Sequence, residues 1–419
     1  MNLLKTSVLN GVAVLIKTTT LFILNKILAV YVGPAGYAVM GQFQNFIQMI
    51  TTFSGNMINT AVTKYTAEYY EDEQKQRNIW KNAGSSVFIL SLFFSLLIVI
   101  FQQQLSIYIF HSLEYQSVFV WFAVFLIFFN FNTLFLAILN GKKEILKLVL
   151  ANIVGSIVSL VITTLLAIQY HLYGALIALA IYQSLAFFIT LYLCYKANWF
   201  KLTYLFGKID QETAKKFASF ALMALVSAIC VPLSQMIIRT YLGHEFGLDY
   251  AGYWEAMIRL SGAYLMLVTT TLGVYYLPRL SELKTLAEIK TEVYLGYKFI
   301  FPFAVIGGIS VYLLRDWVIV LLFSKKFLPM ADLFLWQMIG DTLKIGSWIL
   351  AYLMLSKAMT VLFVTTEILF AMSSVILTYI FTQSFGFEGV SIAHLINYGL
   401  YWFVMSIFVF KHLQMRVLK

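Results

Sequence analysis

Long apolar stretches alternate with short polar breaks along almost the whole chain. Each stretch is about 20 residues long, which is the length at which an α-helix crosses the hydrocarbon core of a bilayer. Most stretches are apolar on nearly all sides, unlike the narrow apolar stripe of a helix in a soluble domain. The pattern predicts twelve membrane-spanning helices, at residues 9–31, 38–60, 83–102, 117–139, 146–168, 173–195, 217–240, 252–275, 295–314, 332–355, 359–381 and 387–410.

The composition agrees with an integral membrane protein. Of the 419 residues, 61% are hydrophobic and 11% are charged, and the mean hydropathy is +0.83. Soluble domains carry about 25% charged residues, so the net charge of +10 does not indicate a soluble nucleic-acid-binding protein. Cys194 and Cys230 lie in apolar runs, and we therefore expect neither a disulfide framework nor a cysteine metal site.

The basic residues are distributed unevenly over the predicted loops. The N-terminal tail, the even-numbered loops and the C-terminal tail hold 21 of the 29 lysines and arginines, whereas the odd-numbered loops and their flanks hold four. Cytoplasmic loops of membrane proteins carry an excess of basic residues. We therefore expect both termini in the cytoplasm, and most of the net charge reports orientation rather than an acidic partner.

The two halves of the chain resemble each other at a constant offset. A shift of 215 positions aligns four spans without a gap and places Trp121 over Trp336 and Lys142 over Lys357. Six spans per half is an even number, so both halves enter the membrane from the same side. This predicts an all-α membrane protein of two parallel six-helix repeats around a central cavity, as in transporters. The expected lobes are residues 1–200 and 217–419, joined by a cytoplasmic linker at 201–216.

Several polar side chains recur at helical spacing inside the predicted spans. In the tenth span, Gln337, Asp341 and Lys344 fall on one face of a helix. A charge at the bilayer centre costs about 2.5–3.5 kcal/mol, so such a stripe is expected to face a wet cavity or a partner. Charged residues inside spans are Lys17, Lys26, Glu255, Arg259, Asp341, Lys344 and Glu367. A neutral stripe in the second span includes Asn45, Gln48 and Asn56, for which hydrogen bonding between helices is the alternative.

Pairing is the alternative to a cavity for the charged residues. Glu255 and Arg259 are spaced i, i+4, and Asp341 and Lys344 are spaced i, i+3, so each couple could neutralise itself on its own helix. Arg239 lies near a membrane boundary, where a side chain that snorkels into the interface is expected.

The lysines of the first span have no neighbouring acid on their own helix. Lys17 and Lys26 are nine residues apart and therefore face opposite sides of a straight helix. One is expected to line the cavity while the other contacts an adjacent helix or an acid such as Glu367. Proton coupling would require a titratable group inside the membrane, and Asp341, Glu367 and His394 are the candidates. For His394, a packed polar role is the alternative.

Sequence motifs of common catalytic sites are absent. The chain contains no G-x-x-x-x-G-K-[ST] loop and no H-E-x-x-H motif, and its histidines and carboxylates show no metal-ligand spacing. The segments between spans are too short to fold as an enzyme domain. We therefore expect a protein that is not an enzyme and that uses no cofactor, no metal and no nucleic-acid partner.

Short motifs in a fixed order resemble the Wzx-type flippases of the polysaccharide exporter (MOP) superfamily. The resemblance covers most of the chain and is densest from about residue 215 to residue 370. It is closest to the branch that translocates lipid III of enterobacterial common antigen and O-antigen repeats. The motifs are Gly33-Pro34-Ala35-Gly36, Asn45-Phe46, Val62-Thr63-Lys64-Tyr65, Tyr276-Leu277-Pro278, Leu280-Ser281, Leu313-Leu314-Arg315-Asp316, Ser324-Lys325-Lys326-Phe327, Gly340-Asp341 and Leu343-Lys344.

The resemblance implies a transporter of the bacterial inner membrane that works by alternating access. Its cargo would be an undecaprenyl-pyrophosphate-linked oligosaccharide, moved from the cytoplasmic to the periplasmic leaflet for lipopolysaccharide or common-antigen biosynthesis. Further partners would be membrane lipids and a polysaccharide polymerase with its chain-length regulator. Lys17, Lys26, Asp341, Lys344 and Glu367 resemble charged positions of the family. Glu255 and Arg259 depart from the usual pattern of that branch, which leaves the sugar of the cargo open.

The residues and the resemblance together assign three sets of side chains. Residues expected to hold the pyrophosphate are Lys17, Lys26, Arg239, Arg259 and Lys344. Residues expected to hold sugars are Asn45, Gln48, Asn56 and Gln337. Residues expected to couple an ion or to pair are Glu255, Asp341 and Glu367. The alternative is an ion-coupled exporter of small cationic drugs on the same fold, which would have a cavity dominated by acids and aromatic rings.

Overall fold

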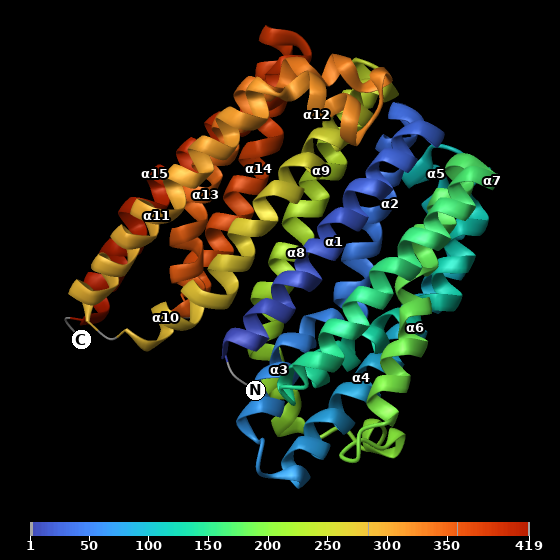
Figure 1. Cartoon of the computed structure of the whole chain (residues 1–419), viewed down its shortest axis with the longest axis vertical. Helices are drawn as coiled ribbons and strands as arrows, with labels where there is room; N and C mark the ends of the chain where they lie inside the picture. Colours follow the sequence, from blue (N-terminus) through green and yellow to red (C-terminus); the bar gives the residue numbers. More distant parts are fainter. Residues whose placement is uncertain (1–2, 284, 358, 418–419) are drawn as a thin grey trace. The chain divides into compact units, whose positions relative to one another are not determined.

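Helices make up every regular element in the described part of the chain, which comprises residues 3–283, 285–357 and 359–417 of a computed structural model (Figure 1). A long apolar run offers its backbone polar groups no partner in a bilayer other than the helix itself. The chain divides into two compact units, Met1–Pro232 and Leu233–Lys419, here called unit 1 and unit 2. The lobe and linker limits expected from the sequence remain predictions.

Unit 1 contains the first seven helices and the start of the eighth. The polypeptide reverses direction within α7, where His171 departs from helical dihedral angles. The helices are α1 (Leu3–Tyr31), α2 (Gly33–Ser54), α3 (Asn59–Glu68), α4 (Glu73–Ile100), α5 (Gln102–Phe110), α6 (Gln116–Gly141), α7 (Ile145–Tyr195) and α8 (Gln211–Glu245), with short helices at Asn56–Ile58 and Leu202–Leu205.

Unit 2 contains the remainder of α8 and all later helices. The polypeptide leaves α9 through a π-helical turn at Leu272–Tyr276, and Figure 1 shows α11, α13 and α15 running alongside one another. The helices are α9 (Leu248–Thr271), α10 (Leu277–Glu282), α11 (Leu286–Leu313), α12 (Arg315–Leu322), α13 (Phe334–Ser356), α14 (Thr360–Phe385) and α15 (Gly389–Val417), with 3-10 segments at Lys325–Leu333 and Gly386–Glu388.

The predicted spans lie largely within these helices. Seven stretches of the described chain are long and apolar enough to cross a membrane. Two of them, Ile145–Tyr195 and Thr360–Lys411, are 51 and 52 residues long, which suffices for two crossings each at about 20 residues per crossing. The chain is therefore a multi-span helical protein, and the number of twelve spans remains a prediction.

The turn that precedes α7 in unit 1 has the same geometry as the turn that precedes α14 in unit 2. Glu144 precedes α7 with φ −78° and ψ 59°, and Met359, 215 positions later, precedes α14 with φ −81° and ψ 59°. The Glu144 amide donates to the Leu139 carbonyl at 3.0 Å, and the Met359 amide donates to the Met354 carbonyl at 2.9 Å. The sequence repeat is thus also a repeat of backbone hydrogen bonds.

A second turn repeats at the same offset. His171 has φ 49° and ψ −126°, and Gly386 has φ 63° and ψ −146°. Just beyond them, a Cβ on Gly174 would meet the backbone oxygen of residue 166, and a Cβ on Gly389 would meet that of residue 381. Glycine is required at these contacts because the backbones approach too closely for a side chain. The two repeats therefore share the geometry of this reversal.

An aromatic cluster fills part of the interior of unit 1. The ring of Phe43 on α2 lies 5.5–6.4 Å from the rings of four other phenylalanines, mostly in edge-on or tilted arrangements. Such arrangements add favourable ring contacts to the burial of apolar area. The aromatic cluster consists of Phe43, Phe46, Phe110, Phe119 and Phe122.

Candidate functional site

Asp341 lies in the middle of α13 in unit 2 and is fully buried, at 0% exposure. Its Oδ2 accepts a hydrogen bond from the Tyr264 hydroxyl on α9 at 2.7 Å. Its Oδ1 lies 2.9 Å from His394 Nε2 on α15 and 3.3 Å from Gln337 Nε2 on α13 itself. A buried carboxylate requires such partners because it has lost its hydration. Three helices therefore meet at one acidic side chain.

A glycine allows α15 to approach this carboxylate. A Cβ added to Gly340, the residue before Asp341, would lie 2.5 Å from Cδ2 of His394 and 3.1 Å from the backbone of Leu395. Any larger side chain would therefore push α15 away from α13. The Gly340-Asp341 motif therefore supplies both the close contact and the acid.

Lys344 lies one turn further along α13 and faces a second set of partners. Its Nζ is 5.1 Å from the ring centroid of Trp348 and 4.9 Å from that of Tyr398 on α15. It also interacts electrostatically with Asp341 and with Glu367 on α14. The lysine is thus balanced by two carboxylates and held between aromatic faces, an arrangement that stabilises a desolvated cation. Below, the α13 cluster denotes Gln337, Asp341, Lys344, Glu367 and His394.

A second charged group of unit 2 joins α8 to α9. Glu255 receives a 2.5 Å hydrogen bond on Oε2 from Arg239 and a 2.7 Å hydrogen bond on Oε1 from Arg259. The Arg239 guanidinium also lies 5.6 Å from the ring of Trp254. We call Arg239, Glu255 and Arg259 the arginine–glutamate triad. The i, i+4 pair that the sequence left open is formed, and a third residue completes it.

Arg239 differs from its sequence-based interpretation. A snorkelling side chain would place its charge in the interfacial water, but Arg239 is only 2% exposed. Burial of its guanidinium is tolerated because Glu255 supplies a counter-charge at hydrogen-bond distance. The snorkelling interpretation is therefore wrong, because tertiary contact with α9 replaces contact with water.

Two amides of the predicted neutral stripe in unit 1 bind other parts of that unit. The Asn45 side chain is 7% exposed, and its Nδ2 donates to the Pro232 carbonyl at 3.3 Å. The Asn56 Oδ1 accepts hydrogen bonds from the Thr133 hydroxyl at 2.7 Å and from Asn59 Nδ2 at 3.1 Å. These contacts correspond to the interhelical alternative, and binding of sugars by Asn45 and Asn56 remains a prediction.

The other candidate residues of unit 1 lie nearer its surface. Gln48 on α2 and Lys17 on α1 are exposed, and Lys26 is half-buried. The structure thus brings Gln337, Asp341, Lys344 and Glu367 together within unit 2, and the arginine–glutamate triad within the same unit. A cavity that unites these groups with Lys17, Lys26 and Gln48 remains a prediction.

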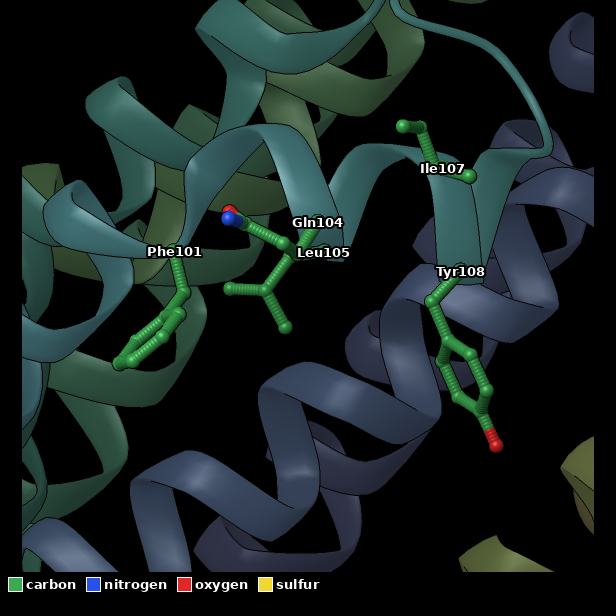
Figure 2. Close-up of a pocket in the computed structure, with 5 residues that line it drawn as sticks. All are labelled: Phe101, Gln104, Leu105, Ile107 and Tyr108. Atoms are coloured by element: carbon green, nitrogen blue, oxygen red, sulfur yellow. The ribbon is translucent and has the colours of Figure 1, made fainter.

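An apolar cavity lies elsewhere in unit 1, at the joint between α4 and α5 (Figure 2). Its volume is about 540 Å³, and Figure 2 shows that Phe101, Leu105 and Tyr108 project from the same side of the short helix. Gln104 and Ile107 complete the lining. None of these five side chains is charged, so this cavity does not suit an anion and contains none of the residues expected from the sequence.

Two residues of the site were not identified from the sequence. Tyr264 donates to Asp341, and Ser261 Oγ lies 3.3 Å from Gln337 Nε2. Both lie on α9 with i, i+3 spacing and therefore share a face. That spacing was the available signal, but serine and tyrosine are ordinary residues of membrane helices. His394 was a candidate proton-binding group, and the structure places it against Asp341.

Comparison with known proteins shows similarity along almost the whole chain. Residues 3–284 match the family described as "Polysaccharide biosynthesis protein". The chain is 29% identical over 405 residues to the lipid III flippases of Escherichia coli (strain K12) and Shigella flexneri, which covers 96% of this chain and 97% of each relative.

Solved structures show the same fold at lower sequence identity. An inward-facing multidrug resistance MATE family transporter of the MOP superfamily matches with a TM-score of 0.75 and 15% identity, covering 94% of each chain. A mutant MATE transporter of Vibrio cholerae matches with a TM-score of 0.68 and 15% identity, covering 98% of each chain. The chain therefore shares its fold with these solved structures.

Proposed function

Because the chain belongs to the polysaccharide biosynthesis protein family, we propose that it is a flippase that moves a lipid-linked oligosaccharide across the bacterial inner membrane. Relatives that match 96% of the chain are named lipid III flippases, not enzymes. In this proposal the cargo is an undecaprenyl-pyrophosphate-linked repeat of the enterobacterial common antigen or O-antigen type. It passes from the cytoplasmic to the periplasmic leaflet by alternating access, with both termini in the cytoplasm.

The observation that carries the proposal is the environment of Lys344. A half-buried ammonium lies between two aromatic rings and interacts with two carboxylates. A pyrophosphate would be attracted to Lys344 once Asp341 and Glu367 are protonated, and more strongly than in water, because the surroundings are poor in water. Its negative charge would also disfavour the ionised forms of Asp341 and Glu367, so anion binding and proton uptake would be coupled at one cluster. His394 is the group positioned to exchange that proton with Asp341.

The remaining candidates have supporting roles in this proposal. Gln337 belongs to the α13 cluster and would contact a sugar of the cargo, and Gln48 of α2 has the same proposed role. Lys17 and Lys26 would guide the pyrophosphate. The arginine–glutamate triad carries one net positive charge, which adds to the attraction for an anion.

Flipping can be measured in proteoliposomes with a fluorescent undecaprenyl-pyrophosphate oligosaccharide and a reductant that quenches only the outer leaflet. We expect Lys344→Gln to lower the flipping rate at least about tenfold, since one lost charge-assisted contact is worth about 1.5–3 kcal/mol. The matched control is Phe129→Leu, which changes the repeat-equivalent position of unit 1. Equal rates for wild type and a folded Lys344→Gln protein would remove Lys344 from the site.

Export of a small cationic drug is the second candidate function. It is favoured by the two carboxylates and the aromatic rings of the α13 cluster. The same proteoliposomes, loaded with a fluorescent cationic dye, distinguish the two functions. Dye efflux without oligosaccharide flipping would show that the protein exports cationic drugs and would contradict the flippase proposal.

A further inference from the structure

Three lysines of unit 1 gather around two aromatic rings at the turn between α6 and α7. Lys142 Nζ lies 5.1 Å from the ring centroid of Tyr70 and 5.4 Å from that of Trp199. Lys143 Nζ lies 5.5 Å from the Tyr70 ring, and Lys147 Nζ lies 5.9 Å from the Trp199 ring. Because each ring is shared by two lysines, the three ammonium groups form one patch. We call these five residues the lysine–aromatic site.

Hydrogen bonds and ring packing hold this site in place. Lys142 Nζ donates to Gln76 Oε1 at 3.0 Å, and the Gln76 amide donates to the Thr66 carbonyl at 2.7 Å. The Trp199 indole donates to Glu144 Oε1 at 2.9 Å and packs on the buried ring of Trp80 at 5.5 Å. The positions of Lys142 and Trp199 are therefore set before any ligand arrives.

The charges around the site leave a positive excess. Glu144 lies 3.3 Å from Lys147 Nζ, and Glu73, which interacts with Lys142 electrostatically, is itself paired with Arg77 at 2.6 Å. Burial lowers the pKa of Lys142 below its ordinary value. An anion beside that ammonium would therefore recover electrostatic energy that burial has cost.

The fold does not require these side chains. Unit 2 makes the same backbone turn before α14, yet the positions equivalent to Lys143, Glu144 and Lys147 are Ala358, Met359 and Leu362. Lys142 is retained as Lys357, which donates to the Leu283 carbonyl at 2.5 Å. The first lysine is thus a feature of the repeat, whereas Lys143, Glu144 and Lys147 have no charged counterpart in unit 2.

We propose that the lysine–aromatic site binds the head group of an anionic membrane lipid that carries two phosphates, as cardiolipin does. Three ammonium groups offset by one adjacent carboxylate match two phosphate charges. Aromatic side chains lie at the level of lipid head groups, and basic pockets at the cytoplasmic ends of helices bind such lipids. The bound lipid stabilises unit 1 and is distinct from the transported cargo.

Native mass spectrometry of the full-length protein with added cardiolipin tests this site. We expect the double variant Lys143→Gln/Lys147→Gln to bind cardiolipin at least about tenfold more weakly than wild type. The control double variant Lys196→Gln/Lys201→Gln removes the same charge from exposed lysines that are not among the five residues of the site and should bind cardiolipin like wild type. Lys143→Gln alone, which changes an exposed side chain, should give a smaller loss and remains testable if the double variant fails to fold.

Other lipids separate the two-phosphate head group from general attraction. Phosphatidylglycerol, with one phosphate, should bind the wild type more weakly than cardiolipin, and soluble pyrophosphate should compete with cardiolipin. Equal losses in the test and control double variants, or equal binding of both lipids, would overturn the proposal. A third outcome would also overturn it: an undecaprenyl-pyrophosphate oligosaccharide displaces cardiolipin, but soluble pyrophosphate does not. The site would then bind the transported cargo.

Discussion

The two units place opposite chemistry at equivalent positions of one repeat. Phe43 lies at the centre of the aromatic cluster of unit 1, and the residue 216 positions later is Arg259 of the arginine–glutamate triad. Phe122 of the same cluster corresponds, 215 positions later, to Gln337 of the α13 cluster. The shared backbone thus accommodates either aromatic packing or ion pairs. Charges inside unit 2 are therefore not a requirement of this fold, which is why we assign them to function.

Other positions were kept the same in both units. Phe119 and Phe334, at the start of α6 and α13, are both fully buried. Lys142 at the end of α6 donates to Gln76 in the first turn of α4. Lys357 at the end of α13 donates to Leu283, just before α11 begins. The ends of α6 and α13 therefore keep equivalent side chains and contacts, whereas residues further inside the helices, such as Phe122 and Gln337, differ.

The largest expected loss of stability follows from removing the acid of the triad. Glu255→Gln leaves the buried Arg239 and the half-buried Arg259 without their shared counter-charge, and we expect the free energy of unfolding to fall by about 3–5 kcal/mol. The measurement is the temperature at which heating halves the monodisperse peak of the detergent-solubilised protein in size-exclusion chromatography. The control Glu245→Gln, at an exposed position of α8, should leave that temperature unchanged.

A combined variant extends this comparison. Arg239→Met/Glu255→Leu/Arg259→Phe gives unit 2 an apolar filling, with the phenylalanine that unit 1 has at the equivalent position. Replacing a whole buried ion cluster with apolar side chains is often neutral or stabilising, so stability should return while flipping is lost. Retained flipping would show that the triad serves only the fold.

The reciprocal change in unit 1 should affect stability without abolishing transport. Phe43→Ala removes the central ring of the aromatic cluster, and we expect a loss of about 3 kcal/mol. The protein that remains folded should flip oligosaccharide at the wild-type rate per molecule. Phe43→Leu serves as the control and should cost less, because it leaves most of the volume filled. A flipping defect in Phe43→Leu would contradict the assignment of the aromatic cluster to packing alone.

The backbone turn that recurs at His171 and Gly386 should give a smaller change in the free energy of unfolding. His171 has a positive φ that favours glycine, and unit 2 has Gly386 there. We expect His171→Gly to raise the free energy of unfolding by about 1 kcal/mol, and Gly386→Ala to lower it by a similar amount. Thermal unfolding of both variants provides the measurement. Opposite signs are required, and a loss of stability in His171→Gly would show that its side chain contributes more than the strain costs.

The smallest effect concerns pH. Burial lowers the pKa of Lys142 in the folded protein, so the unfolded chain binds more protons at this position at alkaline pH. Stability should therefore rise slightly as pH increases through the folded pKa towards the ordinary lysine value of about 10.4. Thermal unfolding across this range should show the rise in wild type and in Lys196→Gln, and a smaller rise in Lys142→Gln, because burial also lowers the pKa of Lys357. An undiminished rise in Lys142→Gln would assign it to another group.

Much of the candidate site could be predicted one helix at a time. The stripe of Gln337, Asp341 and Lys344 followed from helical spacing, and the structure places Gln337 and Asp341 in contact. The i, i+4 pair of Glu255 and Arg259 was also accessible, because its geometry depends only on the pitch of one helix. Contacts between helices were not accessible in this way.

The missing information was the identity of partners that are distant in sequence. His394 and Tyr264 lie 53 and 77 positions from Asp341 along the chain, and no periodicity links them. Arg239 was assigned to the interface because its position near a span end was known while its contact with Glu255 was not. For the neutral amides, spacing alone could not decide between a cavity and the observed hydrogen bonds of Asn45 and Asn56.

The sequence by itself determined that the chain is a multi-span helical membrane protein built from two repeats. This follows because, in a bilayer, each apolar stretch can satisfy its backbone only as a helix, and because duplication leaves a constant offset. Tertiary structure decided which charges are neutralised and by what. Partner choice depends on the packing of helices against one another, as where Gly340 admits His394 to Asp341, and that packing is a property of the assembled unit rather than of any single span.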